Sequence, residues 1–178
     1  MSKSRELKVE PRGEREIVIT RSFDAPRGLV FEAMTRPELL KRWLGVFGGW
    51  SLAVCEVDLR VGGAYRYLWQ GPDGATMGMR GTFREIAPPE RIVNTEKFDE
   101  AWYPGEAVGT AVLTEHDGRT TVTTTVLYES REIRDAALGS GMERGIAAGY
   151  LALDDILASQ ALASQTLASQ TGVEGRTS

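Results

Sequence analysis

Residues 17–43, IVITRSFDAPRGLVFEAMTRPELLKRW, decide the fold, because a strand passes there directly into two short helices. The apolar run predicts a strand over residues 16–23. Asp24 then stands where the N-cap of a helix belongs, since its carboxylate can accept hydrogen bonds from the free amides of the first turn. Thr35-x-x-Glu38 has the pattern of a capping box and predicts a second short helix that ends near Trp43.

The rest of the chain adds strands joined by turn-forming residues, and then helices. Short connections such as Pro72-Asp73-Gly74 favour hairpins, so we expect an antiparallel sheet of six or seven strands. A small helix is expected over residues 131–138 and a long one over residues 140–157, behind a second capping-box pattern, Ser140-x-x-Glu143. The strands are expected at residues 16–23, 51–58, 64–70, 77–86, 91–98, 107–115 and 120–128.

Two glycines interrupt the apolar stripe of the long helix. Glycine inside a helix costs about 1 kcal/mol relative to alanine. Gly145 and Gly149 therefore indicate either a close approach of another segment or room left for a ligand.

The chain is long enough for one domain with a sizeable core. We expect that domain at residues 16–159, after a polar and flexible lead-in at residues 1–15. Leu-Ala-Ser-Gln occurs three times at a spacing of five residues, at 157–160, 162–165 and 167–170. That spacing turns each copy by about 140° around a helix, so the leucines share no face. We expect residues 160–178 to be a low-complexity, disordered tail.

Composition narrows the partners and the compartment. The net charge is −4 and no basic cluster stands out, which disfavours nucleic acid as a partner. The chain has no uninterrupted apolar run of membrane-spanning length and no signal peptide pattern, so we expect no membrane partner. A single cysteine, Cys55, excludes an intrachain disulfide and fits a cytoplasmic protein.

Short motifs in a fixed order carry a family resemblance over residues 16–158. They are Phe23-x-Ala25-Pro26, Thr35-x-Pro37-Glu38-x-x-x-x-Trp43, Asp58-x-x-x-Gly62-Gly63-x-Tyr65, Gly71-Pro72-Asp73-Gly74, Glu85-Ile86-x-Pro88-Pro89-x-Arg91-Ile92, Thr121-x-Thr123 and Gly141-Met142-Glu143-x-Gly145. With them the chain resembles the START-like (SRPBCC) superfamily and, within it, the Activator of Hsp90 ATPase homologue 1-like family.

The resemblance implies an α+β helix-grip fold, a curved antiparallel β-sheet wrapped around a long C-terminal α-helix with two short helices between the first and second strands. It also implies a cavity between sheet and helix, which in this superfamily holds lipids, sterols, polyketides and other apolar molecules. A homodimer and an Hsp90-like chaperone are the protein partners that it suggests.

Aromatic and methionine side chains are the best candidates for a ligand site, because they line adaptable apolar pockets and tyrosine hydroxyls can orient a ligand. The other interpretation is that they fill the core beneath the long helix. The candidate ligand-binding residues are Trp43, Trp50, Tyr65, Tyr67, Trp69, Met79, Trp102, Met142, Ile146 and Tyr150.

Candidates for catalysis are few. Glu96 would be a general acid or base if it pointed inward beside Asn94 and Phe98, but we expect it to face solvent or to pair with an arginine. Glu56 and Arg66 present the same choice between a buried pair and a surface pair.

The single histidine and the single cysteine offer little chemistry. His116 is expected in a solvated turn and Cys55 as a small buried hydrophobe. Together they cannot complete a zinc site, so we expect no metal and no cofactor.

Three hypotheses follow. The leading one is non-enzymatic binding of a small apolar or aromatic molecule between the sheet and the C-terminal helix. The second is a cyclase- or hydrolase-type enzyme that uses the same cavity, and the third is a partner module of an Hsp90-type chaperone.

Overall fold

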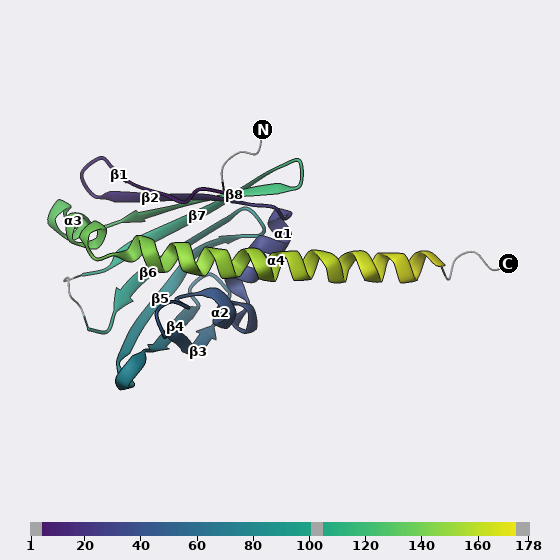
Figure 1. The fold of residues 1–178 in the computed structure, drawn as a ribbon. Coiled ribbons are helices and arrows are strands. Elements are labelled where there is room, and N and C mark those ends of the chain that lie inside the picture. The colour runs from purple at the N-terminus through teal and green to yellow at the C-terminus, as the bar shows by residue number, and fades with distance from the viewer. Residues whose placement is uncertain (1–4, 101–104, 174–178) are drawn as a thin grey trace.

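A single antiparallel sheet with a long helix lying across one face makes up the protein (Figure 1). The computed structural model describes residues 5–100 and 105–173. The sheet has the strand order β1-β2-β8-β7-β6-β5-β4-β3. Its strands are β1 (Lys8–Arg12), β2 (Glu16–Phe23), β3 (Ser51–Val57), β4 (Ala64–Gln70), β5 (Thr76–Ala87), β6 (Arg91–Phe98), β7 (Ala107–His116) and β8 (Arg119–Leu127).

Four helices complete the fold: α1 (Arg27–Thr35), α2 (Pro37–Trp43), α3 (Arg131–Gly139) and α4 (Met142–Val173). A short 3₁₀ turn, Pro72–Gly74, joins β4 to β5. Helices α1 and α2 lie between β2 and β3, and α4 crosses the sheet, so the predicted helix-grip fold is confirmed.

The described strands number one more than the sequence predicts, because β1 forms within the segment expected to be a flexible lead-in. It pairs antiparallel with β2, from Lys8 opposite Thr20 to Arg12 opposite Glu16. The side chain of Val9 packs against the core, while most of its neighbours on β1 are exposed. The prediction for this segment was wrong because β1 is an edge strand with one partly buried side chain. The polar residues around that side chain have the composition of a flexible lead-in.

The side-chain caps predicted for three helices do not form. The hydroxyls of Thr35 and Ser140 donate instead to backbone carbonyl oxygens of the preceding turn. Asp24 pairs with Arg5 rather than with the first turn of α1. At the start of α3, by contrast, the Ser130 hydroxyl accepts from a backbone amide, although the sequence reasoning did not single it out. Hydroxyl groups can bond either way along the backbone, so sequence alone does not choose between a cap and a back-bond.

Helix α4 is longer than predicted, since it runs to Val173 rather than ending near residue 157. Its first half is a core helix in which Tyr150, Leu153, Ile156 and Leu157 are buried. Its second half extends beyond the sheet, and Leu162 and Leu167 are exposed there. The five-residue repeat places these leucines on different sides of the helix, so they form no common apolar face.

By length and composition alone, the Met142–Thr171 part of α4 is apolar enough to cross a membrane. Core helices of globular domains share this property, and the first half of α4 packs as such a helix.

A buried ion pair attaches α4 to the sheet. The guanidinium of Arg21 on β2 donates to both carboxylate oxygens of Asp154, each at 2.6 Å. The Arg21 side chain is only 4% exposed, and its guanidinium also lies 4.7 Å from the centroid of the Phe23 ring. One turn earlier, a Cβ added to Gly149 would lie 2.8 Å from the carbonyl oxygen of Trp43, so glycine permits the close approach of α4 to α2.

Replacing Asp154 with Ala should destabilise the protein by about 3 kcal/mol, because the buried Arg21 guanidinium would lose its carboxylate. Equilibrium unfolding in urea measures the loss. Asp155→Ala is the matched control, since Asp155 is exposed on the same helix and its loss should cost within about 0.5 kcal/mol. Equal effects of the two substitutions would contradict the role given to the ion pair.

Candidate functional site

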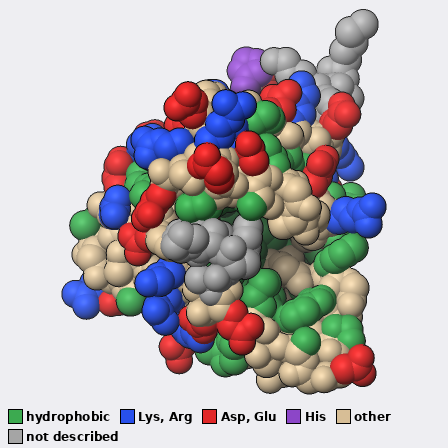
Figure 2. All heavy atoms as spheres, turned by 90° about the vertical axis from the view of Figure 1, so that its left-hand side faces the viewer, with side chains coloured by type: hydrophobic (Ala, Val, Ile, Leu, Met, Phe, Trp, Pro, Cys, Tyr) green, Lys and Arg blue, Asp and Glu red, His purple; other side chains and the backbone are tan. Residues whose placement is uncertain are grey.

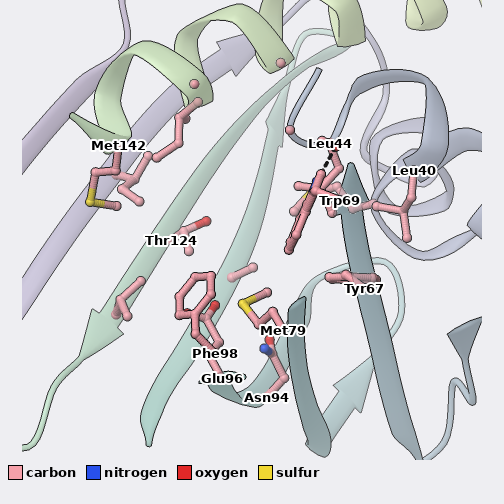
Figure 3. A pocket seen from close by; sticks show the side chains of 18 of the residues that line it. Leu40, Leu44, Tyr67, Trp69, Met79, Asn94, Glu96, Phe98, Thr124 and Met142 are labelled. Atoms are coloured by element: carbon pink, nitrogen blue, oxygen red, sulfur yellow. Dashed lines mark hydrogen bonds between the residues drawn. The ribbon is translucent and has the colours of Figure 1, made fainter. Parts of the chain in front are cut away.

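A cavity of about 600 Å³ lies between the sheet and the first turns of α4. Strands β4 to β8 supply its floor, and α2 and the loop after it form one end. Figure 2 looks onto the hollowed face, where hydrophobic side chains gather around the opening, and Figure 3 shows the lining from close by.

Three aromatic side chains of β4 form one wall of the cavity. Tyr65, Tyr67 and Trp69 alternate with Arg66 and Leu68, and strand geometry puts alternate residues on the same face. The ring centroids of Tyr65 and Tyr67 are 4.9 Å apart, and those of Tyr67 and Trp69 are 5.7 Å apart. Contacting rings hold one another in place, so this wall is largely formed before any ligand binds.

The indole N–H groups of both tryptophans in the cavity donate hydrogen bonds to backbone carbonyl oxygens. The indole of Trp43 donates to the carbonyl oxygen of Ala33 at 2.9 Å, and that of Trp69 donates to Leu44 at 3.0 Å. The first bond joins α2 to α1, and the second holds the loop after α2 against β4. The cavity therefore meets the apolar rings of Trp43 and Trp69, and neither indole offers it a free donor.

The roof of the cavity comes from the start of α4. Met142, Gly145, Ile146 and Tyr150 line it at helical spacing. A Cβ added to Gly145 would meet no atom within 4 Å, so this glycine leaves open space. Tyr150 closes the inner end, where its ring packs against Trp43 and burial raises the pKa of its hydroxyl to about 12.

Glu96 points into the cavity, contrary to our expectation that it faces solvent or pairs with an arginine. It shares the inner face of β6 with Asn94 and Phe98, and Figure 3 shows the three together with Met79 beside them. Burial raises the pKa of the Glu96 carboxyl to about 7. Among the described residues that line the cavity, Glu96 is the only acidic or basic side chain.

A small hydrogen-bond network lies next to Glu96. The hydroxyl of Tyr65 donates to the carbonyl oxygen of Thr95. The amide nitrogen of Asn94 donates to the Tyr65 hydroxyl at 3.2 Å and to the same carbonyl oxygen at 3.3 Å. Burial also raises the pKa of Tyr65, so its hydroxyl remains a donor at neutral pH.

The structure brings together eight of the ten candidate ligand-binding residues. Trp50 is not among the lining residues, because it packs over Gly71 beside the turn between β4 and β5. Trp102 lies outside the described residues. The eight candidates that do line the cavity are Trp43, Tyr65, Tyr67, Trp69, Met79, Met142, Ile146 and Tyr150.

Several lining residues were not predicted as ligand contacts. Asn94 and Phe98 follow from the period-two alternation of β6 once the face of Glu96 is known. Phe83 and Thr124 also line the cavity, and nothing in their local sequence marks them. Other side chains on the same faces of their strands pack in the core. Sequence alone cannot tell a core side chain from one that lines a cavity.

The remaining candidates for chemistry lie away from the cavity. Cys55 is half-buried on β3, and burial raises the pKa of its thiol to about 11, so the thiol stays protonated at neutral pH. His116 is exposed at the end of β7, next to the turn that leads into β8, rather than in the turn itself as predicted. Arg66 pairs with Asp99 rather than with Glu56. The predicted Glu56–Arg66 pair therefore forms neither in the interior nor at the surface. Within the part of the chain that the structure describes, no cluster of three His, Cys, Asp or Glu is placed to hold a metal ion.

The chain matches a known protein family. The model for the family described as Activator of Hsp90 ATPase homolog 1-like protein matches residues 24–158. A search of curated proteins gives no match to the chain.

Solved structures similar to this one come from several bacteria. A crystal structure of a protein from Rhodobacter sphaeroides is 32% identical, with a TM-score of 0.81 over 86% of this chain and 99% of that one. A solution structure of a protein from Arthrobacter aurescens is 27% identical, with a TM-score of 0.75 over 85% and 91%. An HSP90 activator from Plasmodium falciparum is 25% identical, with a TM-score of 0.50 over 64% of this chain and 72% of that one.

The raised pKa of Glu96 predicts how stability changes with pH. The carboxyl holds its proton more tightly in the folded chain, at a pKa of about 7, than in the unfolded chain, where the ordinary value is 4.5. Stability from this group is therefore fully present below about pH 4.5 and is lost as the pH rises through 7. Glu96→Gln removes the titration, so the variant should gain about 1 to 3 kcal/mol over the wild type by pH 8.

Urea unfolding at several pH values between about 4.5 and 8 measures this difference. Glu56→Gln is the control, because Glu56 is exposed on β3 and makes the same change of charge. Parallel pH profiles for wild type and Glu96→Gln would show that Glu96 is not buried as described.

Proposed function

The chain belongs to the Activator of Hsp90 ATPase homolog 1-like family, and on that premise we propose that it binds a small, largely apolar or aromatic molecule in the cavity between its sheet and α4.

The observation that carries this proposal is the cavity itself. Protein interiors are normally packed as densely as organic crystals, so an apolar space of about 600 Å³ is unusual in a domain of this size. That volume falls within the range of about 300–1,000 Å³ found for small-molecule sites. Gly145 supports the same conclusion, because a larger residue there would fill the space and would favour the helix.

The lining favours binding over catalysis. Glu96 can serve as a general acid or base, but no histidine or cysteine accompanies it among the described lining residues. An acid or base without an activated nucleophile is a weak basis for the cyclase or hydrolase alternative. Contacting aromatic rings and methionines, in contrast, suit an apolar ligand directly.

Filling the cavity from α4 should abolish binding without unfolding the protein. Gly145→Leu places a side chain in open space and replaces a helix-interior glycine, so the fold should be retained. Affinity for an apolar fluorescent probe such as 1-ethylpyrene should fall by at least about tenfold, or ~1.4 kcal/mol. Quenching of tryptophan fluorescence on titration measures the affinity, since Trp43 and Trp69 line the cavity.

Ser159→Leu is the matched control, since it adds the same side chain to an exposed position of α4. Equal binding by both variants would contradict a ligand site beneath the start of α4. Failure of the wild type to bind the probe, or to gain thermal stability from it, would count against the proposed function as a whole.

A second candidate function rests on the similarity to the HSP90 activator from Plasmodium falciparum. If this chain is also a partner of an Hsp90-type chaperone, adding it to that chaperone should raise the rate of ATP hydrolysis. A steady-state ATPase assay with the chaperone of the same organism measures the effect. An unchanged rate would dismiss this candidate and would leave the binding proposal untouched.

A further inference from the structure

We propose that the cavity selects apolar molecules that carry a protonated amine, with the nitrogen seated on the Glu96 carboxylate and the side-chain oxygen of Asn94. This inference rests on the proposed binding function and names the chemical class of the ligand.

The orientation of Asn94 follows from its partners. The carbonyl oxygen of Thr95 can only accept, so the Asn94 atom that lies 3.3 Å from it must be the amide nitrogen. The Tyr65 hydroxyl gives its proton to the same carbonyl oxygen, and it therefore accepts from Asn94. The hydrogen bonds of this network thus all end on Thr95 or Tyr65. The side-chain oxygen of Asn94 takes no part in them and remains an acceptor.

Glu96 and Asn94 both line the cavity from the same face of β6, so a ligand group in the cavity can contact their oxygens. Gly109 lies on β7 opposite Asn94. A Cβ added there would lie 3.1 Å from a carboxylate oxygen of Glu96, 3.6 Å from the side-chain oxygen of Asn94 and 3.7 Å from the amide nitrogen of Asn94. The two acceptors thus converge above a residue that has no side chain.

Among the described residues, no side chain of opposite charge is paired with the Glu96 carboxylate. Burial is the cause of the raised pKa of Glu96, and none of the described lysines or arginines pairs with its carboxylate. A buried carboxylate is stabilised most by a cation that also donates hydrogen bonds. An ammonium group meets both requirements, because it has three donors and no acceptor.

The surroundings also suit a cation on an apolar body. The ring of Tyr67 lies between Tyr65 and Trp69 on the neighbouring wall, and Phe98 lies beside Glu96. Aromatic faces attract cations and contact apolar groups equally well. The hydroxyls of Tyr67 and Thr124 can donate or accept, so they do not counter this preference.

Three pyrene probes of similar shape test the proposal: 1-pyrenylmethylamine, its uncharged isostere 1-ethylpyrene, and 1-pyreneacetate. Titrations followed by fluorescence are done near pH 8, where Glu96, with a pKa of about 7, is mostly ionised and an alkyl amine is protonated. The wild type should bind the amine at least about tenfold more tightly than 1-ethylpyrene, and 1-pyreneacetate most weakly.

Two variants locate that preference at the proposed oxygens. Glu96→Gln keeps the shape and removes the charge, and Gly109→Ala places a methyl group 3.1 Å from the Glu96 oxygen, which must shift to make room. Both should lose the preference for the amine over 1-ethylpyrene. Glu56→Gln, the exposed control, should keep it.

The outcomes separate the two proposals. Equal affinity for amine and isostere, tighter binding of 1-pyreneacetate, or an amine preference that survives in Glu96→Gln would overturn the inference while apolar binding stands. If no probe binds the wild type, the proposed function fails, and the inference that rests on it fails as well.

Discussion

The attachment of α4 at its middle is the constraint on which the site depends. The Arg21–Asp154 ion pair ties the helix to β2, and Gly149 lets it touch the end of α2 at Trp43. A straight helix that is attached to the curved sheet at one place cannot pack closely against it along its whole length. The turns of α4 before this attachment, from Met142 to Ile146, therefore stand away from the sheet. Side chains fill only part of the space between them, and the unfilled part is the cavity.

Four polar side chains of the cavity already use their donors within the protein. Trp43 and Trp69 donate their N–H groups to backbone carbonyl oxygens. The Tyr65 hydroxyl donates to the Thr95 carbonyl oxygen, and the Asn94 amide donates to that oxygen and to the Tyr65 hydroxyl. These bonds make the walls rigid, because each one joins two different elements or orders a side chain along a strand. The oxygen atoms of Glu96 and Asn94 thus stand in a largely apolar space.

Much of the fold and one wall of the site could be predicted from sequence, because both rest on local periodicity. The alternation of Tyr65, Tyr67 and Trp69 fixes a shared face whatever the rest of the chain does. The face of Glu96 could not be predicted, since it depends on register across β5, where the pairing shifts between Phe83 and Glu85. The caps at Thr35 and Ser140 were predicted wrongly for a related reason: a hydroxyl has two backbone partners within reach, and tertiary packing chooses between them.

The strand β1 changes what the molecule shows to its neighbours. Without it, β2 would end the sheet, and its apolar run from Ile17 to Ile19 would present unpaired backbone groups to other chains. β1 replaces that edge with a five-residue strand that carries exposed charges at Lys8, Glu10 and Arg12, and with Pro11, which has no N–H to donate. Short, charged, proline-bearing edges are poor templates for strand addition. The segment that looks least like structure in the sequence is thus the protein's protection against aggregation at this edge.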